Sequence, residues 1–128
     1  MDQNLAINIV IAVAIAWFIA TRFSGVKGLR TLKADQLNDE LKANRHHVLI
    51  DVREPGEVKQ GYIAGATNIP LSQFKQRIGE IPLDRSIYLY CRSGMRSKQA
   101  ARLLYKSGYR KLAHLQGGIM TWRGQLKK

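Results

Sequence analysis

The sequence predicts an α/β domain with a central parallel sheet flanked by helices, preceded by one membrane-spanning helix. Segments typical of strands alternate with segments of helical periodicity along most of the chain, and this alternation is the pattern of parallel sheets. Residues 48–52 form a continuous apolar run around one aspartate, as expected of a strand buried on both faces. The length of 128 residues fits a single domain with a short extension.

The first segment, residues 5–23, is strongly apolar and carries a tryptophan and two phenylalanines toward its end. A spanning helix needs about 20 apolar residues, so residues 1–23 are predicted to form a transmembrane anchor. Residues 1–4 are acidic rather than positively charged, which disfavours a cleaved signal peptide. Basic residues follow at positions 22, 27, 30 and 33. The positive-inside rule then places the N-terminus outside and the following domain in the cytoplasm.

The rest of the chain divides into a short flexible linker, residues 24–30, and a domain, residues 31–128. A first helix is expected to begin around Thr31 and to bury Leu37 and Leu41. Strands are expected at residues 48–52, 66–70, 87–90 and 112–115, and the third of them is expected to be central. Helices are expected at residues 71–81, 97–107 and 119–122.

Charge is distributed unevenly over the chain, whose formal net charge is +12. No acidic residue follows Asp84, whereas basic residues recur throughout that part of the chain. These are Arg85, Arg92, Arg96, Lys98, Arg102, Lys106, Arg110, Lys111, Arg123, Lys127 and Lys128. This part should carry a positive field that suits small anions, an acidic protein or an anionic membrane surface. Nucleic acid is disfavoured as a partner, because no basic-aromatic motif of a nucleic-acid module is present.

The single cysteine, Cys91, lies between the strand predicted at residues 87–90 and the helix predicted at 97–107. Amide N–H groups of such a loop and of the helix N-terminus can point at one anion, so a thiolate there is stabilised and nucleophilic. Arg92 and Arg96 add positive charge on either side. A lone cysteine is often a small buried hydrophobe, but the surrounding glycine, serines and arginines favour a reactive one. The predicted catalytic residues are Cys91, Arg92 and Arg96, and the predicted substrate-binding loop residues are Ser93, Gly94, Met95 and Ser97.

Four motifs, in order, resemble those of the rhodanese (sulfurtransferase) family. They are Asp51-Val52-Arg53-Glu54, Gly61-Tyr62-Ile63-Ala64-Gly65-Ala66 followed by Asn68-Ile69-Pro70, Cys91-Arg92-Ser93-Gly94-Met95-Arg96-Ser97, and Leu115-Gln116-Gly117-Gly118 with Trp122. With its N-terminal anchor, the chain is similar to small membrane-anchored single-domain bacterial rhodaneses. Tyr62 stands where the family often has histidine, and Ala64 where it often has proline. Met95 adds an apolar group at the loop tip that would influence the choice of acceptor.

The resemblance implies a rhodanese-like α/β domain and a sulfurtransferase mechanism without a metal or an organic cofactor. The Cys91 thiolate would attack the outer sulfur of a donor such as thiosulfate, and sulfite would leave. The resulting persulfide would pass its sulfur to cyanide in an assay, or to a thiol or a protein acceptor in a cell. Arg92 and Arg96 would orient the anion and stabilise its charge.

Several polar residues have structural interpretations. Asp51, Arg53 and Glu54, at a strand end, are expected to support the site through an ion pair or a helix cap. Arg96 has an alternative, which is to pair with an acidic side chain and not face the pocket. Three histidines and one cysteine do not have the spacing of a metal site. His46 and His47 are interpreted as solvated loop residues, His114 as a surface residue and Trp122 as a core residue.

Two further functions remain open. A phosphatase or arsenate reductase would use a similar anion-binding Cys/Arg loop, typically one residue longer than the spacing of four residues between Cys91 and Arg96. A membrane-tethered protein-binding module is the other, although inactive members of the family usually lose the cysteine that this chain keeps. A sulfur relay to a protein acceptor lies between these functions.

Overall fold

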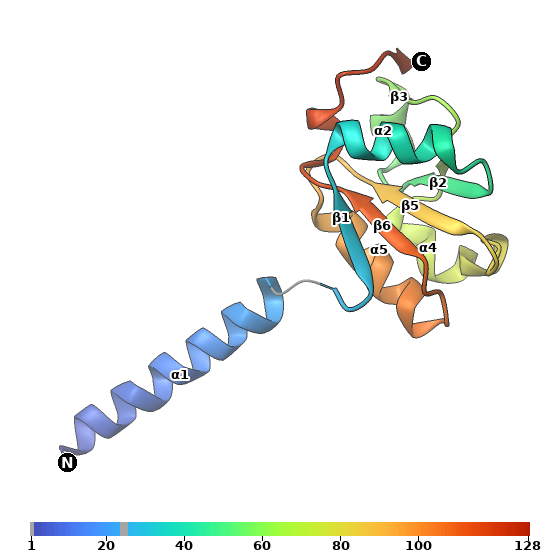
Figure 1. Cartoon of the computed structure of the whole chain (residues 1–128). Helices are drawn as coiled ribbons and strands as arrows, with labels where there is room; N and C mark the ends of the chain where they lie inside the picture. Colours follow the sequence, from blue (N-terminus) through green and yellow to red (C-terminus); the bar gives the residue numbers. More distant parts are fainter. Residues whose placement is uncertain (1, 24–25) are drawn as a thin grey trace.

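The computed structural model describes residues 2–23 and 26–128, and Figure 1 shows its α/β domain and N-terminal helix. The helices are α1 (Gln3–Phe23), α2 (Ala34–Ala43), α3 (Pro55–Val58), α4 (Leu71–Arg77) and α5 (Met95–Lys106), with the 3-10 helices η1 (Ile78–Glu80) and η2 (Gly118–Thr121). The strands are β1 (Leu29–Leu32), β2 (His47–Asp51), β3 (Tyr62–Ile63), β4 (Thr67–Asn68), β5 (Ser86–Tyr90), β6 (Leu112–Leu115) and β7 (Leu126–Lys127).

The main sheet has the strand order β1-β6-β5-β2-β4, and every pair in it is parallel. Strand β5 lies in the middle, as predicted, so the residues that follow it emerge at the centre of one sheet edge. Strands β3 and β7 form a small antiparallel pair that ties the C-terminal segment back to the domain.

Two hydrophobic clusters fill the space on either side of the sheet, and α2 covers the face opposite α4 and α5 (Figure 1). Ile87 and Leu89 of β5 face the cluster that includes Phe74 of α4 and Leu104 of α5. The cluster on the other face includes Tyr88 and Tyr90 of β5, Leu37 of α2, and Leu49 of β2. Alternate residues of one strand thus enter opposite layers, which is why the central strand is apolar without interruption.

Residues 3–20 of helix α1 do not pack on the domain. Its 18-residue window Gln3–Ala20 has a mean hydropathy of 2.0 and is entirely unburied. A helix of 21 residues is about 32 Å long at 1.5 Å per residue, close to the thickness of a bilayer core. By length and composition it is able to cross a membrane, a property that signal sequences share. Ser24 and Gly25 of the predicted linker lie outside the described residues.

The structure corrects several predicted boundaries. Thr31 does not begin a helix but lies in strand β1, paired with His114 of β6, and α2 begins only at Ala34. Strand β1 was not predicted at all, and it begins within the segment predicted to be linker. Helix α5 begins two residues earlier than predicted, at Met95. The helix predicted at 119–122 is a single 3-10 turn, and the C-terminal part of the helix predicted at 71–81 is also a 3-10 turn.

Candidate active-site loop

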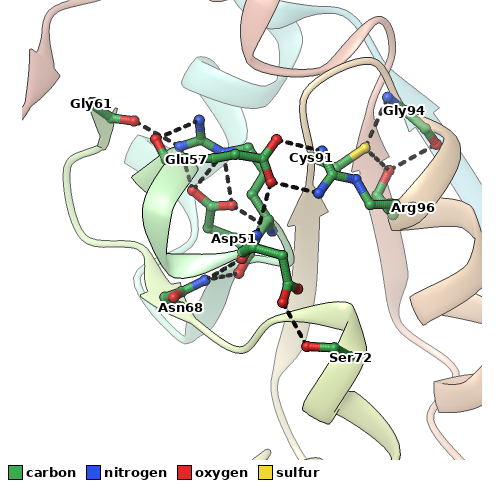
Figure 2. Close-up of polar contacts among 11 residues, drawn as sticks. Asp51, Glu57, Gly61, Asn68, Ser72, Cys91, Gly94 and Arg96 are labelled. Atoms are coloured by element: carbon green, nitrogen blue, oxygen red, sulfur yellow. Dashed lines mark hydrogen bonds and ion pairs between the residues drawn. The ribbon is translucent and has the colours of Figure 1, made fainter. Parts of the chain in front are cut away.

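Cys91 directly follows β5 at the carboxyl edge of the parallel sheet, where ligands of α/β domains bind. Its side chain is 1% exposed and joins the hydrophobic cluster under α4 and α5. The backbone N–H of Gly94 donates a hydrogen bond to the Cys91 Sγ over 2.9 Å, and the Ser97 Oγ lies 3.7 Å from the same sulfur (Figure 2). One of the amide donors expected in this loop therefore points at the sulfur, and the sulfur is more deeply buried than its polar sequence context suggested.

Gly94 is the N-cap of α5 and gives the loop its sharp turn into the helix. Its φ of +105° lies in a region that side chains rarely adopt. Arg92, Ser93 and Met95 are exposed around it, and the Met95 side chain is 55% exposed. One cation and one apolar side chain thus flank the buried sulfur on the surface of the loop.

The segment that follows β6 contacts the backbone of the cysteine loop. Ile119 donates its backbone N–H to the Cys91 carbonyl over 2.8 Å, and Met120 donates to the Arg92 carbonyl over 3.4 Å. Gly118 allows this approach, because a Cβ at that position would lie only 2.2 Å from the Arg92 carbonyl oxygen. The two residues that follow the Leu115–Gly118 motif therefore hold the cysteine loop through backbone hydrogen bonds, and Gly118 allows the close approach.

Arg96 makes a bidentate ion pair with Glu57 of α3, which Figure 2 shows beside the cysteine. The two guanidinium nitrogens lie 2.7 and 2.8 Å from the carboxylate oxygens of Glu57. This is the alternative that the sequence left open for Arg96. The carboxylate also accepts the backbone N–H of Glu54 over 3.0 Å. The Arg96 side chain is only 30% exposed, so it fastens the start of α5 to α3.

Glu57 was missed by the sequence analysis, although its spacing of three residues from Glu54 is that of a capping box. The hydrogen bonds from Arg96 lower the pKa of Glu57 from 4.5 to about 2, with a further contribution from the Glu54 N–H. The carboxylate is therefore ionised at every physiological pH, and the pair with Arg96 persists.

Glu57 is expected to make folding sensitive to acid. Because its pKa is lower in the folded protein, its stabilisation is complete above pH 4.5 and is lost as the pH falls toward about 2. Both partners are about one-third exposed, so the pair is expected to contribute less than about 1 kcal/mol. The free energy of unfolding is measured by urea titration of the full chain in detergent at several pH values from 4.5 down to about 2. It should fall less steeply with pH in Glu57→Gln than in the wild-type protein. Equal slopes for the two proteins would contradict the assignment.

Asp51 and Arg53 form the expected ion pair, which is buried at the carboxyl end of β2. The Arg53 Nη2 lies 2.7 Å from the Asp51 carboxylate and 2.7 Å from the Gly61 carbonyl oxygen. The Asn68 Nδ2 donates to the backbone carbonyls of Asp51 and Arg53 over 2.9 and 2.8 Å. These contacts join the first two motifs into one support for the strand end. Neither charged group touches Cys91 among the contacts of the described residues.

Glu54 is the N-cap residue of α3, the capping position predicted for one of these three residues. Its carboxylate accepts a hydrogen bond from the Ser72 hydroxyl over 2.7 Å. Glu54 thus joins α3 to Ser72 of α4, and Figure 2 shows Ser72 on the side of the site away from Cys91.

His114 contradicts its interpretation as a surface residue, since it is 1% exposed. Its Nδ1 lies 2.9 Å from the Ser97 Oγ, and its Nε2 lies 3.3 Å from the Thr31 Oγ1. Burial, with a smaller contribution from Lys98, lowers the pKa of His114 from 6.5 to about 4. The imidazole is therefore neutral at physiological pH. The Ser97 hydroxyl contacts both this ring and the Cys91 sulfur.

The other residues singled out from sequence lie away from the sulfur. His46 is exposed, with its Nε2 3.7 Å from Asp84, but His47 is half-buried as the first residue of β2 and stacks edge-on against Tyr88. Trp122 is half-buried and packs against the cluster under α2. Tyr90 was not singled out, yet its hydroxyl accepts the Ile63 N–H over 3.1 Å and connects β5 to β3.

A parallel α/β domain with a cysteine in the loop between its central strand and the next helix is the arrangement of rhodanese-like domains. The chain matches that family over residues 33–125. The uncharacterized protein YqhL of Bacillus subtilis (strain 168) is 42% identical to it over 126 residues, which are 98% of this chain and 97% of that protein. A sulfurtransferase of Allochromatium vinosum is 38% identical over 91 residues, or 71% of this chain and 85% of that protein.

Solved structures agree with this assignment. The crystal structure of a rhodanese-related protein from Thermoplasma volcanium superposes with a TM-score of 0.70 at 29% identity, over 77% of this chain and 97% of that one. The chain belongs to the rhodanese-like family, and both the resemblance and the fold predicted from sequence are confirmed. Its sulfurtransferase relatives support an enzyme of the rhodanese type.

Proposed function

We propose that the protein is a sulfurtransferase that carries sulfane sulfur on Cys91. The observation that carries the proposal is the Gly94 N–H aimed at the Cys91 Sγ over 2.9 Å at the N-terminus of α5. A backbone donor in this position stabilises a thiolate and, after transfer, a persulfide. The 38% identity with a sulfurtransferase of Allochromatium vinosum supports the same chemistry.

In the proposed reaction the Cys91 thiolate attacks the outer sulfur of a donor such as thiosulfate. The sulfur–sulfur bond of the donor breaks, its electron pair leaves with sulfite, and a new sulfur–sulfur bond forms on Cys91. A thiolate, a protein thiol or cyanide then attacks the outer sulfur of the persulfide and regenerates the Cys91 thiolate. Because Cys91 is 1% exposed, the loop that includes Ser93, Gly94 and Met95 must shift to admit the donor.

The two arginines have different roles in this proposal. Arg92 is exposed at the loop surface, where its charge attracts an anionic donor. Arg96 is bound to Glu57, so it stabilises the anion as part of a fixed ion pair and holds the helix N-terminus in place. Ser97, predicted as a loop residue, lies in the first turn of α5, with its hydroxyl 3.7 Å from the sulfur.

The proposed function is tested by giving the full chain in detergent two anionic substrates in parallel. Thiosulfate with cyanide should yield thiocyanate, whereas p-nitrophenyl phosphate should not be hydrolysed above the background rate. Hydrolysis of the phosphate ester without thiocyanate formation would overturn the proposal in favour of the phosphatase-like alternative. Neither reaction, with Cys91 still open to alkylation, would favour a membrane-tethered binding module.

We also propose that residues 5–23 anchor the domain to a membrane, with the N-terminus outside and the domain in the cytoplasm. The unburied apolar helix α1 and the basic residues that follow it support this orientation. A cysteine introduced at position 2 of a Cys91→Ser chain should react with an impermeant maleimide in intact cells. Protection of that cysteine, with labelling restored after lysis, would overturn the orientation.

A further inference from the structure

His114 is a buried polar residue for which the proposed reaction has no role. It lies on β6 between β1 and β5, paired with Thr31 on one side and Leu89 on the other. Its two ring nitrogens contact two hydroxyls, the Ser97 Oγ over 2.9 Å and the Thr31 Oγ1 over 3.3 Å. A buried imidazole that satisfies both of its nitrogens fixes the hydrogens of its neighbours, because a neutral ring has one donor and one acceptor.

The contacts of Ser97 determine which nitrogen is the donor. The Ser97 hydroxyl has a single proton, and it donates that proton to the Gly94 carbonyl oxygen over 3.0 Å. The 2.9 Å contact with His114 then requires that Nδ1 carries the hydrogen and that Ser97 accepts it. Nε2 is left as an acceptor, which the Thr31 hydroxyl satisfies.

The Cys91 thiol completes this arrangement in its protonated form. Its Sγ lies 3.7 Å from the Ser97 Oγ and donates to it. Once the thiol ionises, the sulfur becomes an acceptor and the Ser97 proton can turn toward it. The Gly94 carbonyl does not lose all its donors in this exchange, because the Lys98 N–H also reaches it over 3.4 Å.

We propose that His114 is a positioning residue, whose Nδ1–H holds the Ser97 hydroxyl so that its proton serves the Cys91 thiolate and persulfide. The role toward the persulfide rests on the proposed function, whereas the role toward the thiolate rests only on the hydrogen-bond geometry. If the proton were on Nε2 instead, the Ser97 hydroxyl would have to donate its single proton to Nδ1 and could not donate a hydrogen bond to the sulfur. The Thr31 hydroxyl, on the edge strand β1, can donate its proton to Nε2 over 3.3 Å and is therefore compatible with the tautomer that the Ser97 contacts require.

The groups around His114 keep it neutral during this exchange. Lys98 of α5 is the charged side chain that acts on it, and it disfavours a second positive charge. Thr31 and Leu89, on the strands to either side, are uncharged, and Ser97 separates the ring from the Cys91 sulfur. His114 is therefore a fixed donor and not a general base.

The test is a double-mutant cycle on the full chain in detergent, with the variants Ser97→Ala, His114→Leu and the two combined. The measured quantity is the pH at which alkylation of Cys91 by iodoacetamide is half-maximal. Each single variant is expected to raise it by about one unit, a tenfold change in thiolate population. The double variant is expected to match Ser97→Ala, because His114 acts through Ser97. Alkylation needs no sulfur donor, so a negative result for sulfur transfer leaves this test intact.

The conservative substitution separates positioning from simple packing. In His114→Asn the side-chain amide nitrogen takes the place of Nδ1, so the pH of half-maximal alkylation should stay near that of the wild type. In His114→Gln the amide reaches instead toward Thr31, and the pH should rise as in His114→Leu. The glutamine variant also serves if the leucine variant does not fold, as judged by circular dichroism. Two results would overturn the proposal. One is that His114→Leu raises the pH of half-maximal alkylation as much in the Ser97→Ala background as in the wild type. The other is that His114→Asn raises this pH as much as His114→Leu does.

Discussion

Cys91→Ser is expected to lower the rate of sulfur transfer by roughly a thousandfold or more, as removal of a catalytic nucleophile does. A serine hydroxyl is not ionised near neutral pH, and it has no sulfur with which to form a persulfide. The replacement is nearly isosteric, and the Gly94 N–H that donates to Sγ over 2.9 Å can donate to the serine oxygen instead. The fold should therefore survive while thiocyanate formation from thiosulfate and cyanide disappears.

The matched control for this result is Gln76→Ala on α4, an exposed side chain on a helix that does not contribute to the loop. It should retain wild-type turnover and wild-type thermal unfolding in the same detergent. Turnover by Cys91→Ser within tenfold of this control would mean that another group accepts the sulfur, or that transfer is direct from donor to acceptor.

Gly118→Ala is the substitution outside the loop for which we expect the largest loss of stability. The added Cβ would lie 2.2 and 2.3 Å from the carbonyl oxygen and carbon of Arg92, and 2.6 Å from the carbonyl oxygen of Cys91. These are backbone atoms, so no rotamer relieves the clash, and the φ of +66° adds strain. The loop must move away from η2, which breaks the hydrogen bonds from Ile119 and Met120. A loss of about 2–4 kcal/mol in the free energy of unfolding is expected.

Gly65→Ala separates the clash from the backbone strain. Gly65 also has a positive φ, +87°, but nothing lies within 4 Å of a Cβ placed there. It should lose only about 1 kcal/mol, the cost of an unsuitable backbone conformation, and should keep normal sulfur transfer. If Gly118→Ala is no less stable than Gly65→Ala and is equally active, then the contact between η2 and the loop does not hold the cysteine in place.

The cysteine loop was predictable from sequence because every signal for it is local. An apolar strand, a loop with Gly94 and a helical pattern follow one another without interruption, and parallel topology alone places such a loop at the ligand-binding edge. The continuous apolar run around Leu49 likewise indicated a strand buried on both faces. These predictions require no knowledge of which distant segment is adjacent.

The burial of His114 was missed although the same rule applied. Leu112–Leu115 is a short, otherwise apolar run, and all four residues are buried because β6 lies between β1 and β5. An interior parallel strand has no solvent face on which to place a histidine. Strand β1, which pairs with β6 beside His114, was itself missed. Its residues Arg30 and Thr31 are exposed on an edge strand, so it lacks the continuous apolar pattern of a buried strand.

The pairing of Arg96 with Glu57 was left as an alternative for a different reason. The two residues are 39 positions apart, and their contact depends on how α3 packs beside the loop. Sequence indicates that a buried or half-buried arginine needs a partner, but it does not indicate which carboxylate supplies one. Long-range electrostatic contacts of this kind follow from topology and not from local pattern.

The measurement that tests the account most directly is the intact mass of the full chain in detergent after exposure to thiosulfate, with Cys91→Ser alongside. The wild-type chain is expected to gain the mass of one sulfur atom and to lose it on addition of cyanide, and the serine variant is expected to gain none. A wild-type chain that gains no sulfur, although its cysteine remains open to alkylation, would contradict the central claim that Cys91 carries the sulfur.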